Sequence, residues 1–186
     1  MEGTKSRNVE VKIKLYEYKF NTTSDIICDL IKEGKINETR VIYHVDTFYQ
    51  SLNGRLKLRE INQNRYELIW YDRNDKIGPK LSEYHKINIT DITTYKDVLS
   101  NSNGIIGIVK NKRILYIYGQ TRIHLDFILN LGHFVELEVV LTPNQSVEDG
   151  EKIAKEILSI LKIENEPQIS CAYIDLLIEN QSTFTH

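Results

Sequence analysis

The chain has 186 residues, of which 41% are hydrophobic and 27% charged, and its formal net charge is −2. This composition is ordinary for a globular protein, and the length fits one domain with a sizeable core. A general nucleic-acid-binding protein would be more basic, so nucleic acid is not expected as a partner and any basic site must be local. We therefore predict a single domain over residues 1–186.

The sequence shows no signature of export or membrane insertion. The N-terminal stretch MEGTKSRNVEV has no apolar segment of the signal-peptide type, and no apolar run approaches the length of a membrane span. The two cysteines, Cys28 and Cys171, are too few for a disulfide framework and lack the spacing of a zinc motif. A cytoplasmic protein without a membrane partner is the expectation.

Alternation of apolar and polar residues dominates the chain and predicts eight or nine short strands. In chain order the predicted strands cover residues 8–16, 40–50, 54–61, 65–73, 82–89, 105–110, 112–119, 121–129 and 133–141. Turn signals such as Asn53-Gly54 and Gly104 separate them. This pattern favours an antiparallel β architecture.

Helical periodicity interrupts the strands. Residues 24–33 and 146–161 each carry an apolar stripe, and Ser146 is a capping residue with Asp149 three positions on. Weaker helical patterns cover residues 93–100 and 171–178. Strands and helices together predict an α+β fold, and the two apolar stripes are suited to cover strand faces.

Charges of one sign cluster on single strand faces. In the stretch GRLKLRE, Arg55, Lys57 and Arg59 alternate with leucines, and Glu136 and Glu138 alternate with apolar residues in 133–141. Neighbouring like charges repel, and a face exposed to water gains nothing from such sorting. One interpretation is a solvated antiparallel sheet. The other is a barrel whose charged faces line a wet interior, with the helices packed outside.

A charged interior of this kind predicts a definite chemistry. The planar guanidinium group of arginine can donate two parallel hydrogen bonds to phosphate oxygens, and the ammonium group of lysine attracts them as a compact positive charge. The carboxylates of the predicted strands supply hard oxygen ligands for Mg²⁺ or Mn²⁺, namely Glu10, Asp126, Glu136 and Glu138. Cations on one wall and carboxylates on another predict a site for a polyphosphate chelated to a divalent metal.

Several motifs resemble the CYTH domain, the triphosphate tunnel metalloenzyme superfamily. They are RNVEVKIKL, HVDTFYQ, GRLKLRE, LIWYDRND, TRIHLDFILNLGHFVELEVVL and SCAYIDLL. The resemblance is nearest to the class IV adenylyl cyclase-like branch. It implies a closed antiparallel eight-stranded barrel with helices packed on the outside and a tunnel for a triphosphate. The family signature Glu-x-Glu-x-Lys reads Asn8-x-Glu10-x-Lys12 here, so a neutral amide replaces the first carboxylate.

The resemblance also implies roles for individual residues. The catalytic positions are Glu10, Lys12, Arg59 and Asp126. The phosphate-binding positions are the cations Lys12, Lys14, Arg55, Lys57, Arg59, Arg73, Lys112, Arg113 and Arg122. The metal positions, for Mg²⁺ or Mn²⁺, are Glu10, Asp126, Glu136 and Glu138, with Asp126 acting as a ligand or as an orienting residue. Structural roles are expected for His44, His124, the aromatic residues of 46–49, Tyr173 and Asp175.

The resemblance, together with these residues, implies three possible functions. The main hypothesis is metal-dependent hydrolysis of a small triphosphate: inorganic triphosphate, thiamine triphosphate or a nucleoside triphosphate. The alternatives are cyclisation of ATP to cyclic AMP and pyrophosphate, and binding of a nucleotide or phosphate ligand without turnover. The sequence does not choose between a monomer and a homodimer.

Overall fold

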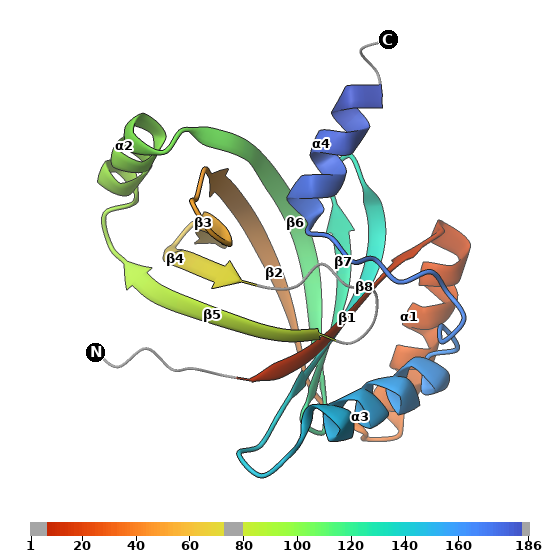
Figure 1. Ribbon diagram of the computed structural model, residues 1–186. Coiled ribbons are helices and arrows are strands. Elements are labelled where there is room, and N and C mark those ends of the chain that lie inside the picture. The colour runs from red at the N-terminus through yellow and green to blue at the C-terminus, as the bar shows by residue number, and fades with distance from the viewer. Residues whose placement is uncertain (1–6, 73–79, 184–186) are drawn as a thin grey trace.

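The computed structural model describes residues 7–72 and 80–183 (Figure 1). Within these ranges the strands are β1 (Asn8–Leu15), β2 (Ile36–Tyr49), β3 (Arg55–Ile61), β4 (Arg65–Asp72), β5 (Lys80–Ile89), β6 (Ile105–Tyr118), β7 (Thr121–Ile128) and β8 (Gly132–Val140). The helices are α1 (Glu17–Lys32), α2 (Ile92–Ser102), α3 (Val147–Ile160) and α4 (Tyr173–Thr183). The predicted α+β class is confirmed, with an eight-stranded antiparallel sheet.

The strand order is β1-β5-β4-β3-β2-β6-β7-β8, and β1 also pairs with β8. Within residues 7–72 and 80–183, the β1–β8 pairing runs from Asn8 to Leu15, and the β1–β5 pairing includes Asn8, Val9 and Glu10. The sheet therefore curls back on itself, so that β1 lies beside both β5 and β8. The long pairings elsewhere in the sheet position the site.

The apolar faces of β1, β7 and β8 pack under helices α1 and α3, which lie on one outer side of the sheet (Figure 1). Val11, Leu125 and Leu137 from the strands join Ile27 of α1 and Leu158 of α3 in one buried cluster. Burial of each such side chain contributes about 1.5–3 kcal/mol. Because the apolar faces are covered from outside, the charged faces of these strands turn toward the interior.

Gly150 explains how closely α3 approaches β1. A Cβ atom at this position would lie 2.6 Å from a methyl carbon of Val9 and 2.7 Å from one of Leu141. Glycine therefore lets the helix pack directly on the strand. The helix begins as predicted, because Ser146 and Asp149 form a reciprocal capping box.

Several predicted element boundaries are wrong: β2 begins at Ile36 rather than at residue 40, and α4 extends to Thr183 rather than ending at residue 178. The helix predicted over 24–33 begins at Glu17, and it includes Thr22 and Thr23, whose hydroxyls donate to carbonyls four residues back. The strands predicted at 105–110 and 112–119 form one strand, β6. Asn111 joins them without a turn, since it pairs with β2 on one side and β7 on the other.

Helix α4 and the segment before it lie near one end of the cavity described below. The amide of Ile169 donates to the carbonyl of Lys12, and Gly107 of β6 lets Ile174 approach closely. This packing brings Tyr173 to the inner face of the sheet.

Among the residues described, no helix combines the length and the apolar character needed to cross a bilayer.

Candidate polyphosphate site

Side chains from all eight strands line a cavity of about 270 Å³. Its charged lining residues are Glu10, Lys12, Asp46, Lys57, Arg59, Glu67, Lys86, Arg113, Arg122, Glu136 and Glu138. Its neutral lining includes Phe48, Tyr71, Asn111 and Tyr173. Charged side chains that the sequence placed on separate strands thus converge on one interior space. The interpretation of these faces as solvated surface does not hold for the residues that line the cavity.

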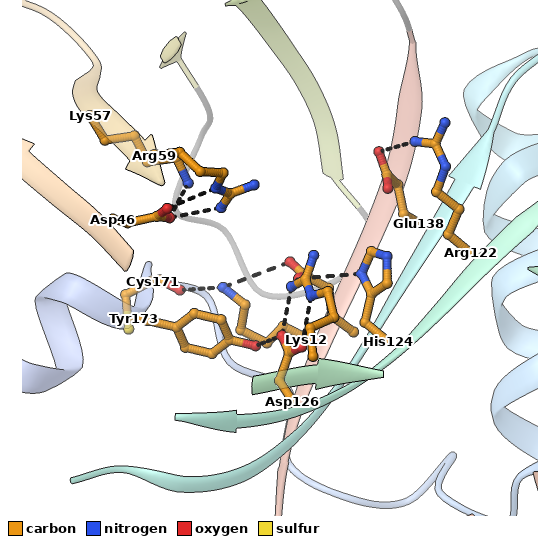
Figure 2. A network of polar contacts seen from close by, with 12 residues as sticks. Lys12, Asp46, Lys57, Arg59, Arg122, His124, Asp126, Glu138, Cys171 and Tyr173 are labelled. Carbon is orange, nitrogen blue, oxygen red and sulfur yellow. Dashed lines mark hydrogen bonds and ion pairs between the residues drawn. The ribbon is translucent and has the colours of Figure 1, made fainter. Parts of the chain in front are cut away.

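The first charge cluster joins β2 and β3. Asp46 is the register partner of Arg59, and its carboxylate accepts two bonds from that guanidinium, each 2.7 Å long (Figure 2). The ammonium group of Lys57 donates to the same carboxylate at 2.7 Å. Burial alone raises the pKa of Asp46, but the charges of Arg59 and Lys57 outweigh it and hold this pKa far below its usual range. Asp46 therefore stays ionised and fixes both cations.

Lys57 is a cation whose charge is sensitive to pH. Burial and the neighbouring charge of Arg59 lower its pKa to about 8, although Asp46 acts in the opposite direction. Its ammonium nitrogen also lies 5.4 Å from the ring centroid of Phe48 and 5.5 Å from that of Tyr71. Above pH 8 the cavity therefore loses part of its positive charge.

This shift predicts that tripolyphosphate affinity falls as the pH rises through about 8. Above this pH, Lys57 of the free protein is mostly neutral and must take up a proton when the anion binds. This proton uptake weakens binding by up to about tenfold per pH unit. Calorimetric titrations between pH 6.5 and 9.5 measure the effect. The matched control is Lys57→Arg, which keeps its charge over this range and corrects for ionisation of the ligand. Parallel pH profiles of the two proteins would contradict the assignment.

The second charge cluster is centred on Arg113 of β6. Its guanidinium donates to both oxygens of Asp126, at 2.7 and 2.6 Å, and to Glu136 at 2.6 Å. The hydroxyl of Tyr173 donates to Asp126 at 2.9 Å. Lys12 lies 4.0 Å from Glu136 and 4.2 Å from the ring centroid of Tyr173. The cluster therefore links β1, β6, β7, β8 and the start of α4.

Asp126 does not face the cavity as a metal ligand would. It has no solvent exposure, and Arg113 and Tyr173 occupy its two oxygens. Of the two predicted roles for Asp126, ligand or orienting residue, these contacts favour the orientation of Arg113. Burial lowers the pKa of Arg113, but Asp126 and Glu136 outweigh this and raise it well above its normal value.

Two further carboxylates face each other across β1 and β8. Glu10 and Glu138 are register partners on β1 and β8, and both line the cavity. Like charges placed directly opposite each other are unfavourable unless a cation lies between them. Glu138 also accepts from the amide of Asn8 and lies 3.0 Å from Arg122. Residues 7–72 and 80–183 contain no ready cluster of three metal-binding side chains.

Three predicted phosphate-binding residues lie outside the cavity, and a fourth is not described by the structure. Lys112 is exposed on the face opposite Arg113, as strand alternation requires, and Lys14 is exposed near the ring of Phe134. Arg55 donates to Asp175 of α4 at 2.8 Å, so this pair helps to dock the helix. None of these three lines the cavity. The fourth, Arg73, falls outside the described residues.

Sequence reasoning missed other lining residues. Asp46 was treated only as part of an aromatic packing stretch, although it is the carboxylate on which Lys57 and Arg59 converge. Glu67 is buried and lies 3.3 Å from Lys86. Strand alternation puts Glu67 and Tyr71 on one face of the strand predicted at 65–73. That signal alone could have identified Glu67 as a candidate.

Several solved structures have a fold similar to that of this chain. A conserved hypothetical protein from Pyrococcus furiosus matches with a TM-score of 0.74 and 19% identity, over 91% of this chain and 99% of its own. A putative adenylate cyclase from Vibrio parahaemolyticus matches with a TM-score of 0.72 and 18% identity, over 95% and 99% of the two chains. The Mimivirus capping enzyme triphosphatase matches with a TM-score of 0.52 and 12% identity, over 84% and 89%. These likenesses show a shared fold.

The sequence comparisons give a more specific result. No curated protein matches the chain. The family model of the CYTH domain, in contrast, matches residues 6–173. Because this match spans most of the 186 residues and agrees with the fold, the protein belongs to the CYTH domain family.

Proposed function

We propose that this protein is a divalent-metal-dependent hydrolase of a small triphosphate, which binds in a tunnel through a closed barrel. The observation that supports this most directly is the convergence of Lys12, Lys57, Arg59, Arg113 and Arg122 on one cavity. Forked guanidinium groups and ammonium groups are the two side-chain types that recognise phosphate oxygens. Inorganic triphosphate, thiamine triphosphate and nucleoside triphosphates are the candidate substrates.

The two aspartates preorganise the cations for this task. An arginine has five N–H donors, and Asp46 engages only Nε and Nη2 of Arg59. Asp46 thereby fixes the direction of the remaining donors, as Asp126 does for Arg113. Donors held in place before the substrate arrives stabilise the charge that develops on phosphoryl oxygens without reorganising. Phosphoryl transfer depends mainly on such positioning and electrostatic stabilisation.

Glu10 and Glu138, with Glu136 beside them, would hold Mg²⁺ or Mn²⁺. The bound ion would polarise a phosphoryl oxygen and neutralise developing charge. Magnesium sites in phosphate-binding enzymes commonly use one or two carboxylates together with substrate oxygens. Asn8 donates to Glu138 and thus orients a metal carboxylate where the family signature has a charged residue.

Turnover assays with three substrates test this proposal. The purified protein is incubated with tripolyphosphate, thiamine triphosphate or ATP, each with Mg²⁺ or Mn²⁺, and the products are identified. Release of orthophosphate supports the hydrolase. Cyclic AMP and pyrophosphate from ATP would instead establish a cyclase, the activity named for the Vibrio relative. Tight binding without any product would establish a binding protein.

Glu138→Gln should reduce metal-dependent turnover by at least about 100-fold, because even supporting residues of metal sites contribute 10–100-fold. The fold should persist, since the amide keeps the size of the side chain and relieves its repulsion with Glu10. Phosphate release and Mn²⁺ binding by electron paramagnetic resonance are the two measurements. Glu156→Gln, on the exposed side of α3, is the matched control. Wild-type Mn²⁺ affinity in Glu138→Gln would rule out the metal role.

A further inference from the structure

Helices cover the outer face of the sheet in two places and leave a gap between them. Ile36 of β2 and Tyr116 of β6 lie in the cluster under α1 and α3, whereas Tyr49 of β2 packs with Leu99 of α2. Between these places, eight outward residues on β2, on β6 and at the end of β7 form a surface that we call the β6 outer face. They are Val41, Tyr43, Val45, Ile108, Lys110, Lys112, Phe127 and Leu129.

The strand register makes these residues neighbours. Tyr43 of β2, Lys112 of β6 and Phe127 of β7 lie side by side in one row. In the next row, the carbonyl of Lys110 accepts a hydrogen bond from the amide of Leu129. Four residue steps along β2 correspond to about 13 Å, and the distance across three strands is about 10 Å. Because an α-helix is about 10–12 Å wide, the β6 outer face has room for one further helix.

The large apolar residues of the β6 outer face are about half exposed. Val41, Tyr43, Ile108, Phe127 and Leu129 each expose between 45% and 55% of their surface. Single exposed apolar residues are common, but a contiguous group of them marks an interaction site. On the neighbouring strands β1, β7 and β8, the outward apolar residues are buried under α1 and α3. A helix packed on the β6 outer face would bury this group in the same way.

The charge of the β6 outer face defines the partner that fits it. Lys110 and Lys112 are exposed, and neither forms an ion pair within the described part of the chain. None of the eight residues of this face is acidic. In a twofold dimer through this face, the lysines of the two copies would oppose each other, which is unfavourable. Acidic side chains beside an apolar stripe would instead complement both cations.

We propose that the β6 outer face binds an amphipathic helix of a partner protein, whose apolar stripe is flanked by acidic residues. The stripe packs on Tyr43, Ile108 and Phe127, and the acidic flank lies over Lys110 and Lys112. The β6 outer face is on the opposite side of the sheet from the cavity. The inference therefore goes beyond the proposed hydrolase function and does not depend on it.

A synthetic acidic peptide tests the charge complementarity. The probe is a helical peptide with leucines on one face and glutamates on both flanks, and calorimetry measures its Kd. Lys110→Glu/Lys112→Glu should raise this Kd at least about tenfold, because two attractive contacts become repulsive. A second probe, with lysines in place of the glutamates, should bind this double variant and not the wild type. The matched control is Lys152→Glu/Lys155→Glu on the exposed side of α3, which changes the net charge equally and should keep the wild-type Kd.

Two matched serine variants test the apolar contact. Ile108→Ser should raise the Kd of the acidic peptide about tenfold, because the leucine stripe loses a partner that it buries. Ile87→Ser, at an exposed position on the outer side of β5, should leave this Kd within about twofold. In ¹⁵N-labelled wild-type protein, the shift changes caused by the acidic peptide should centre on Tyr43 and Lys112.

The other possible occupants of this face are distinguished by the same proteins. Failure of the acidic peptide to bind the wild type overturns the proposal, as do equal binding of both peptides and shift changes confined to another surface. A wild-type dimer that Ile108→Ser dissociates in sedimentation equilibrium would establish a second copy of this chain as the occupant instead. Binding to vesicles of phosphatidylcholine and phosphatidylglycerol that is lost in Lys110→Glu/Lys112→Glu would establish a lipid surface instead.

Discussion

Arg113→Met is expected to lower the free energy of unfolding by about 3–5 kcal/mol, the magnitude associated with breaking a buried ion pair from one side. The guanidinium binds both oxygens of Asp126 and one of Glu136, and Asp126 has no solvent exposure. Its removal leaves two neighbouring carboxylates without their shared counter-charge. Urea unfolding at pH 7 measures the difference.

A double-mutant cycle separates this charge effect from lost packing. Asp126→Asn in the Arg113→Met background should recover part of the stability, because the amide removes one of the two buried charges. Arg40→Met, on the exposed part of β2, is the matched control and should change stability by less than about 0.5 kcal/mol. If Arg113→Met changed the free energy of unfolding as little as this control, Arg113 would not hold the cluster together.

Arg59→Ala should weaken triphosphate binding with little loss of fold. A hydrogen bond to a charged group contributes about 1.5–3 kcal/mol, which corresponds to a 10–150-fold loss in kcat/KM or in affinity. The fold should survive because Lys57 remains 2.7 Å from Asp46 and keeps that carboxylate paired. Steady-state kinetics and calorimetry with tripolyphosphate give the two values, whichever reaction follows binding.

Arg59→Lys is the informative companion variant. It keeps the charge but loses the planar fork, so it should bind more tightly than Arg59→Ala and less tightly than the wild type. A KM in Arg59→Ala equal to that of the wild type would show that this guanidinium does not touch the phosphate chain. The result would direct attention to Arg113 and Arg122 as the main phosphate ligands.

The alternation in the sequence predicted which side chains share a strand face. Glu10 with Lys12, Arg122 with His124, and Glu136 with Glu138 each line the cavity together. This part was predictable because side-chain direction in a strand has a period of two residues and depends only on the local backbone. The same local patterns predicted the α+β class and the capping box of α3, which the structure confirms.

Contacts between distant residues could not be predicted in the same way. Asp46 meets Arg59 because of the register between β2 and β3, which a sequence pattern does not specify. Asn111 fell between two predicted strands, and its inward position emerged only with the continuous strand β6. Arg55 shared a face with Lys57 and Arg59, yet the docking of α4 drew it to Asp175.

The sequence by itself thus determined the strands, their two faces and the separation of acidic from basic side chains. The tertiary structure decided which face is interior, because α1 and α3 cover the apolar side of β1, β7 and β8. It also decided that Lys57, Arg59 and Arg113 are each held by an aspartate or glutamate. The physical reason is that burial and ion pairing depend on neighbours far away in the chain, whereas alternation depends only on adjacent residues.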